Sequence, residues 1–219
     1  MAVAFFDAIK SGSLDEVRRL VGQQPALAGT RDANGVSGIL TAVYHRRPEV
    51  AAALVEMGAP VDIFEASALG LVDRVAALVK GDPARVSAYA TDGFYPLGLA
   101  AFFGQLEVVR LLIAEGADIR ATARNPFKVQ PVHAAAASRN LDILRAVLEA
   151  GADPNIPQQQ GFVPLHEAAS SGNREMAELL VRHGANPRLA NEAGKTSIDL
   201  ARDKGHPDLV AWLVAMVGA

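Results

Sequence analysis

Apolar residues recur along the chain in pairs of short helical patterns, and glycine separates the two members of each pair. In the clearest pair, an alanine-rich stretch covers about 164–171, Gly172 follows it, and a second stretch covers about 174–183. The apolar residues of the second stretch have the spacing of one helix face; they are Met176, Leu179, Leu180 and Val181. Glycine between two such stretches predicts a turn. The pattern therefore predicts units of two short helices.

The pair of helices repeats at a fixed period. The segment Pro131-Val132-His133 returns 33 residues later as Pro164-Leu165-His166, and a degraded copy follows at Thr196. A period of this size indicates one supersecondary unit stacked many times. Stacked repeats form long concave surfaces, which suit the binding of a partner better than catalysis. The repeat thus favours a binding protein before any other feature is considered.

Each unit closes at Gly-Ala-Asp or a relative of it, and glycine after a helix fits a left-handed cap. The closings are Gly58-Ala59-Pro60, Gly116-Ala117-Asp118, Gly151-Ala152-Asp153 and Gly184-Ala185-Asn186. We predict a single domain, 1–219, of about seven units. They are an N-terminal cap at about 1–31, then 32–62, 63–90, 91–122, 123–156, 157–189 and a C-terminal cap at 190–219.

These units resemble the ankyrin repeat family, whose unit reads roughly D-x-x-G-x-T-P-L-H-x-A-A-x-x-G, then a second helix with a leucine pair, then G-A-D. Residues 161–172 match the first part closely, Leu179-Leu180 match the leucine pair, and Gly184-Ala185-Asn186 match the closing. The resemblance covers nearly the whole chain. It implies an all-α repeat solenoid of L-shaped units with short β-hairpin fingers, whose tips and first helices form a concave face.

Two irregularities depart from the family pattern. The first half of the chain is duplicated at an offset of 58, so that Gly12 and Gly58 recur as Gly70 and Gly116. As a result, residues 58–62 lead directly into the third unit without room for a hairpin. We predict that one finger is missing between the second and third units. We also predict a longer and more basic finger over 120–128.

Composition narrows the function further. Half of the residues are hydrophobic, the formal net charge is −3, and there is no cysteine. We expect no nucleic-acid partner, because no strongly basic field exists to hold phosphates. Disulfides and thiolate metal sites are excluded. No apolar run reaches the roughly 18 residues that a membrane span requires, so we expect no membrane segment and a cytoplasmic protein.

His133 and His166 are the residues that most invite a catalytic or metal-binding interpretation. They occupy matching repeat positions, but histidines at this place in the family usually support the finger through hydrogen bonds to backbone. The sequence carries no H-E-x-x-H, no G-x-S-x-G and no glycine-rich phosphate loop. We therefore expect no enzyme and no cofactor. A small-molecule, metal-sensing or enzymatic pocket near these histidines stays open as an alternative.

Aromatic residues are scarce, yet several map to the face that the resemblance makes concave. The predicted partner-binding residues are Tyr44, His45, Leu69, Phe94, Tyr95, Phe102, Phe103, Arg124, Phe127, Lys128 and Phe162. Exposed aromatics anchor interfaces, so we predict a monomeric, non-catalytic module that binds another protein or peptide. Two alternatives remain: Phe102 and Phe103 fill the space of the missing finger, or the stack only self-assembles. The basic finger either meets an acidic partner or is simply a solvated tip.

Overall fold

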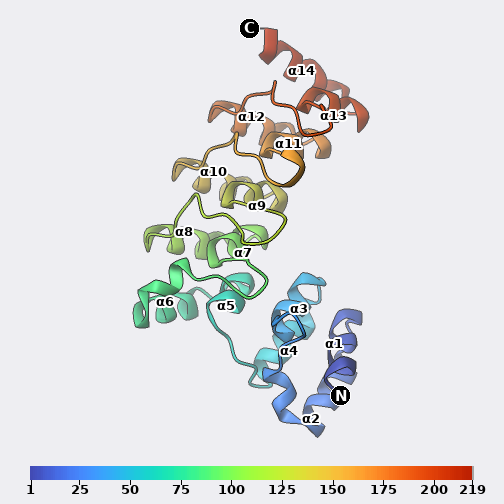
Figure 1. Cartoon of the computed structure of the whole chain (residues 1–219), viewed down its shortest axis with the longest axis vertical. Coiled ribbons are helices and arrows are strands. Elements are labelled where there is room, and N and C mark those ends of the chain that lie inside the picture. The colour runs from blue at the N-terminus through green and yellow to red at the C-terminus, as the bar shows by residue number, and fades with distance from the viewer. Residues whose placement is uncertain (219) are drawn as a thin grey trace.

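The computed structural model describes residues 1–218, and within them the regular structure is helical. The α-helices are α1 (Ala2–Ser11), α2 (Leu14–Gln23), α3 (Gly38–Tyr44), α4 (Pro48–Glu56), α5 (Ile63–Leu69), α6 (Val72–Gly81), α7 (Pro96–Phe102), α8 (Leu106–Ala114), α9 (Pro131–Ser138), α10 (Leu141–Glu149), α11 (Pro164–Ser171), α12 (Arg174–Arg182), α13 (Ser197–Asp203) and α14 (Pro207–Gly218). Short 3₁₀ turns are η1 (Pro25–Gly29), η2 (Pro83–Ser87) and η3 (Gln159–Gly161). Successive helices form antiparallel pairs stacked in chain order (Figure 1). The predicted all-α repeat solenoid is confirmed.

Local sequence signals define each helix pair. Proline begins α9 and α11, where a missing N–H does no harm. Asn173 caps α12 by accepting a hydrogen bond from the Met176 N–H. Gly172 ends α11 in the left-handed region, at φ 67°. A Cβ at Gly172 would lie 2.6 Å from the His206 ring, so glycine is needed for both conformation and space.

The segments that precede first helices are called fingers and are numbered by the unit they open: the second (30–37), fourth (88–95), fifth (118–130), sixth (153–163) and seventh (186–196). They are tight turns without regular strands. Among residues 1–218 the only ladder-type pairings are the isolated bridges Arg31–Ser37 and Ala190–Thr196. Neighbouring tips are joined by backbone hydrogen bonds. The Arg124 N–H donates to the Gly93 carbonyl at 2.8 Å, and the Gln159 N–H donates to the Phe127 carbonyl at 3.0 Å. The fingers thus form a continuous row beside the first helices.

Buried apolar side chains fall into separate clusters rather than one core. The largest runs from Ile63 to Leu213, and a second runs from Phe5 to Ala59. A small third cluster of Leu40, Ala68 and Leu99 lies between them. The boundary between the two large clusters falls between α4 and α5. We call this boundary the joint.

The joint coincides with the shortest link between helix pairs. Residues 57–62 connect α4 to α5 without a bridge, and the tip of the second finger reaches the fourth: a Cβ at Gly35 would lie 2.7 Å from Thr91 Oγ1. The first helices α3, α5 and α7 pack on one another through this region. The second helices pack as α2 on α4, α6 on α8 and α8 on α10, whereas α4 and α6 lack such packing (Figure 1). The stack is therefore joined on its finger side and open on its outer side at the joint.

Candidate functional site

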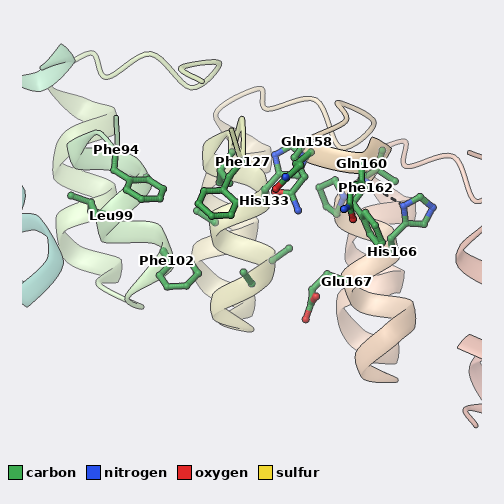
Figure 2. A pocket seen from close by; sticks show the side chains of 18 of the residues that line it. Phe94, Leu99, Phe102, Phe127, His133, Gln158, Gln160, Phe162, His166 and Glu167 are labelled. Atoms are coloured by element: carbon green, nitrogen blue, oxygen red, sulfur yellow. Dashed lines mark hydrogen bonds between the residues drawn. The ribbon is translucent and has the colours of Figure 1, made fainter. Parts of the chain in front are cut away.

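A groove runs along the concave side from α7 to α11. Its volume is about 570 Å³, and its walls come from first helices and from the fingers that precede them. Figure 2 shows Phe94, Phe102 and Phe127 toward one end, and Phe162, His166 and Glu167 toward the other. Most of its surface is apolar, and the small residues Gly98, Ala134 and Ala137 form part of its lining. We call this the aromatic groove.

Some of the aromatic rings at the groove are exposed to solvent, and others are packed against neighbouring repeats. Phe102 is 50% exposed and Phe127 is 53% exposed, so both present ring surface to solvent. Phe103 is half-buried and stacks on Tyr44, with ring centroids 5.9 Å apart. Tyr44 in turn donates a hydrogen bond to Asp92 Oδ2 at 2.7 Å, across the joint. Phe103 thus fills space beside the missing finger, whereas Phe102 remains available for contact.

Tyr95 lies beneath the wall of the aromatic groove and supports it. It is 3% exposed, and its hydroxyl donates to the Val129 carbonyl at 3.3 Å. Its ring lies so close to α7 that a Cβ at Gly98 would be 2.8 Å from the ring carbon Cζ. Burial of the phenol raises its pKa. Tyr95 is therefore a core residue that shapes the groove rather than a contact residue of its surface.

The two histidines at the groove have both ring nitrogens occupied. His133 Nδ1 accepts from the Gln130 N–H at 3.1 Å, and Nε2 bonds the Ile156 carbonyl at 2.9 Å. His166 repeats this geometry with Val163 and Leu189. Because Nδ1 accepts, Nε2 carries the proton and the ring is neutral. Burial lowers the pKa of His133 to about 4 and lowers that of His166 as well. Neither ring offers a nitrogen to a metal or to a substrate.

Polar groups enter the groove at its edges. Gln158, Gln159 and Gln160 line it from the sixth finger, and Glu167 and Ser170 line it from α11. Glu167 Oε1 lies 3.4 Å from Arg139 Nη2 in a solvent-exposed ion pair. The hydrophobic pattern did not single out these residues, because a glutamine run before Gly161 is also typical of a solvated tip. Only their repeat position, directly beside α11, could have pointed to the groove.

The fifth finger places positive charge beside the exposed Phe127 ring. Arg124 and Lys128 are exposed, and no ion pair involves either of them within residues 1–218. The Arg124 guanidinium carbon lies 3.8 Å from the Tyr89 ring centroid, a cation–π contact. Lys128 adopts a left-handed conformation at φ 52°. This edge of the groove therefore pairs an apolar surface with basic side chains.

The structure gathers most, but not all, of the predicted partner-binding residues. Those that line the aromatic groove are Tyr44, Phe94, Tyr95, Phe102, Phe103, Phe127 and Phe162. His45 is exposed but lies outside the groove, and Leu69 is half-buried against the N-terminal cluster. Arg124 and Lys128 flank the groove without lining it. The contiguous surface is thus smaller than the predicted set and is centred on α7, α9 and α11.

Residues 1–218 contain no group of three or more histidine and carboxylate side chains arranged to hold a metal ion. None of the helices they form is both long enough and apolar enough to cross a membrane.

Stacked helix pairs, fingers linked tip to tip and a groove along the first helices define a helical repeat protein. A family model for ankyrin repeats in three copies matches residues 63–158 and 132–219. The chain belongs to the ankyrin repeat family.

Several characterised proteins share part of this sequence. Alpha-latrocrustotoxin-Lt1a of Latrodectus tredecimguttatus is 28% identical over 65% of the chain. Ankyrin repeat and SAM domain-containing protein 6 is 45% identical over 26% of the chain in Danio rerio and 33% identical over 46% in Rattus norvegicus. The chain covers only 8% to 11% of the length of these relatives. The similarity therefore concerns a small part of each relative.

Proposed function

We propose that the chain is a non-catalytic module that binds another protein through the aromatic groove. The exposure of Phe102 and Phe127 at one groove carries this proposal. Large exposed rings that cluster are typical of interface anchors, because their burial by a partner removes much apolar surface from water. Ankyrin repeats are in general protein–protein interaction modules, which supports the same conclusion.

The chemistry at the groove favours an apolar segment with acidic neighbours as the bound part of the partner. The floor accepts apolar side chains, and the amides of Gln158 and Gln160 suit the backbone of such a segment. Arg124 and Lys128 stand beside Phe127 with no ion pair among the described residues, so an acidic side chain placed there gains a charge partner. The acidic flank follows from this charge complementarity.

The alternative of a metal-sensing or enzymatic pocket near His133 and His166 gains no support from the groove. Both rings are neutral and fully hydrogen-bonded, and a general base or metal ligand requires a nitrogen lone pair that faces the reactant. A small apolar molecule remains the competing occupant, because about 570 Å³ falls within the range of small-molecule sites.

A display library of random short peptides tests this function directly. Peptides selected on the chain are measured by fluorescence polarisation against the double variant Phe102→Ser, Phe127→Ser. We expect affinity to fall by more than about tenfold, since exposed aromatic anchors dominate binding. Phe103 is left intact because its ring packs at the joint. Val214→Ser is the matched control, since Val214 is also 50% exposed but lies on α14.

The charge preference is tested separately with Arg124→Glu and Lys128→Glu together. The affinity for peptides with acidic residues beside the apolar segment is expected to fall roughly threefold to tenfold, and by less at high salt. Arg145→Glu on the outer helix α10 controls for net charge. Selected peptides that bind both variants as tightly as the parent chain would place the binding surface elsewhere. Stabilisation by small apolar compounds without any peptide selection would favour the competing occupant.

A further inference from the structure

The joint is held together mainly on its finger side. On its finger side it is held by α3 on α5, by the small cluster of Leu40, Ala68 and Leu99, and by the Tyr44–Asp92 hydrogen bond. On its outer side α4 and α6 lack the packing that joins α2 to α4, α6 to α8, α8 to α10 and α10 to α12, and α12 and α14 at the end of the stack lack it too. The Arg74 side chain on α6 donates hydrogen bonds to the Val61 carbonyl of the link. The finger-side contacts therefore hold the joint closed, and residues 57–62 are the short link about which it can open.

The 58-residue duplication explains why an acidic residue is buried at the joint. It makes α5 the equivalent of α1, the cap helix, and it aligns Glu65 with Asp7. Asp7 is exposed on the free face of α1, where an acidic side chain remains hydrated. The equivalent face of α5 is covered by α3, and Glu65 is 0% exposed. The joint therefore buries an acidic residue at a position that is solvated on the cap.

Only one of the two oxygens of the Glu65 carboxyl group has a hydrogen-bond partner. Its Oε2 accepts from the Asp62 N–H at 3.1 Å, which completes the capping box of α5. Its Oε1 has no hydrogen-bond partner, and the nearest cation, Arg31 Nη2, lies 3.7 Å away. The same Arg31 nitrogen is closer to Asp62 Oδ2, at 3.2 Å. One arginine thus faces two carboxyl groups, and the Ser67 hydroxyl nearby is also buried without a partner.

We propose that residues 1–56 form a body that swings about residues 57–62, and that negative charge on Glu65 opens the joint between α3 and α5. In the closed state Glu65 is neutral. In the open state the outer gap between α4 and α6 widens, Glu65 is hydrated, and the Tyr44–Asp92 bond breaks.

The charges around Glu65 support this assignment. Burial and the neighbouring Asp62 raise its pKa to about 7, from an ordinary value of 4.5. The groups that face it are Arg31 and Ser37 from the second finger, Tyr44 from α3 and Asp62, the N-cap of α5. The helix α7, packed on the other side of α5, carries no ionisable side chain. On α6, which also packs on α5, the charged residues are Asp73, Arg74 and Lys80, and Arg74 is bound to the Val61 carbonyl. Within residues 1–218 Arg31 is the one cation at ion-pair distance from Glu65, and it is partly exposed.

The raised pKa of Glu65 determines how the closure of the joint depends on pH. Because the closed joint binds the Glu65 proton more tightly than the open one, closure is fully favoured below pH 4.5 and weakens as pH rises to about 7. Tyr44 belongs to both the joint and the aromatic groove, so opening also withdraws one wall from the groove. The hinge does not depend on what the groove binds.

Distance measurements across the joint test the hinge without any partner. The chain has no cysteine, so Ala52→Cys on α4 with Ala76→Cys on α6 provides one pair of spin-label sites on exposed positions. Arg110→Cys on α8 with Arg145→Cys on α10 provides the matched pair across an interface that is packed. Pulsed electron paramagnetic resonance then gives both distance distributions at pH values on either side of about 7.

We expect the α4–α6 distance to lengthen and broaden as pH rises, while the α8–α10 distance stays constant. Glu65→Gln is expected to hold the joint closed at every pH, and Tyr44→Phe to broaden the distribution even at low pH. A single narrow α4–α6 distance at all pH values, in the parent chain and in Tyr44→Phe, would overturn the hinge. A pH response that persists in Glu65→Gln would overturn the control by Glu65.

Discussion

His133 and His166 each hold their own helix to the residue before it and to the next finger. Nδ1 accepts from the residue that precedes the helix, and Nε2 reaches the carbonyl of Ile156 or Leu189 in the next finger. The resemblance to ankyrin repeats implied this supporting role, and the hydrogen bonds agree with it. What the sequence could not provide is the identity of the acceptor carbonyls, which lie in the finger after the helix pair.

Protonation of these rings should destabilise the fold. The pKa of His133 is about 4 in the folded chain, against an ordinary value of 6.5, so its stabilising contribution is complete above pH 6.5 and is lost as pH falls toward 4. Glu65 has the opposite sign in an overlapping window, so the measurement uses the Glu65→Gln background. The free energy of unfolding from urea titrations is expected to decrease over this range.

His133→Ala in that background should be less stable at neutral pH but should show a flatter pH profile. His45→Gln serves as the control, because His45 is exposed. A profile that His133→Ala leaves as steep as before would assign the acid sensitivity to other groups.

At the scale of elements, the helices could be predicted from the sequence, whereas the interfaces between them could not. The glycines and the leucine pair marked each helix pair, because periodicity and breakers act within a few residues. The fingers were expected as β-hairpins, and they occur as tight turns, each closed by a backbone hydrogen bond across its base, with two isolated bridges and no longer strand pairing among residues 1–218. The exposure of Phe102 beside the packed Phe103 depends on how α7 meets α3, which no local pattern records.

The row of fingers gives a prediction about glycine. Gly93 has φ 81°, and a Cβ there would lie 2.5 Å from the Arg124 carbonyl oxygen, whereas Gly116 has φ 83° with open space around it. Gly116→Ala therefore carries only the backbone penalty, about 1 kcal/mol or somewhat more. Gly93→Ala must also separate two fingers, so we expect it to lose at least about 1 kcal/mol more. Urea denaturation of both variants measures the difference, and equal losses would mean that the fingers separate without penalty.

At the scale of the whole molecule, the two large clusters share no buried side chain. The cluster from Ile63 to Leu213 is contiguous through the remaining units. Repeat stacks gain stability from each unit and each neighbouring interface, so removal of a weak interface leaves the rest intact. Apart from Tyr44, the residues that line the aromatic groove also lie within the segment 63–219.

We therefore expect the fragment 63–219 to fold without residues 1–62. Circular dichroism should show a helical spectrum and one cooperative thermal transition, and Glu65 should lose its raised pKa because α3 no longer covers it. As the reference, a fragment cut within the contiguous cluster, 97–219, should be much less stable because it exposes the apolar face of α7. A fragment 63–219 that is unfolded at room temperature would show that the joint contributes essential stability.

The row of backbone hydrogen bonds between finger tips has a mechanical consequence. Its bonds run from Arg124 to Gly93, from Gln159 to Phe127 and from Glu192 to Gln160, so each of these fingers is tied to the next through its backbone. No such backbone bond joins the second and fourth fingers among the described residues, and the hydrogen bond at that place runs from the Tyr44 side chain of α3 to Asp92. Under a pulling force on its two ends the molecule will extend first at the joint, and it acts as a short elastic element between two stiff arms.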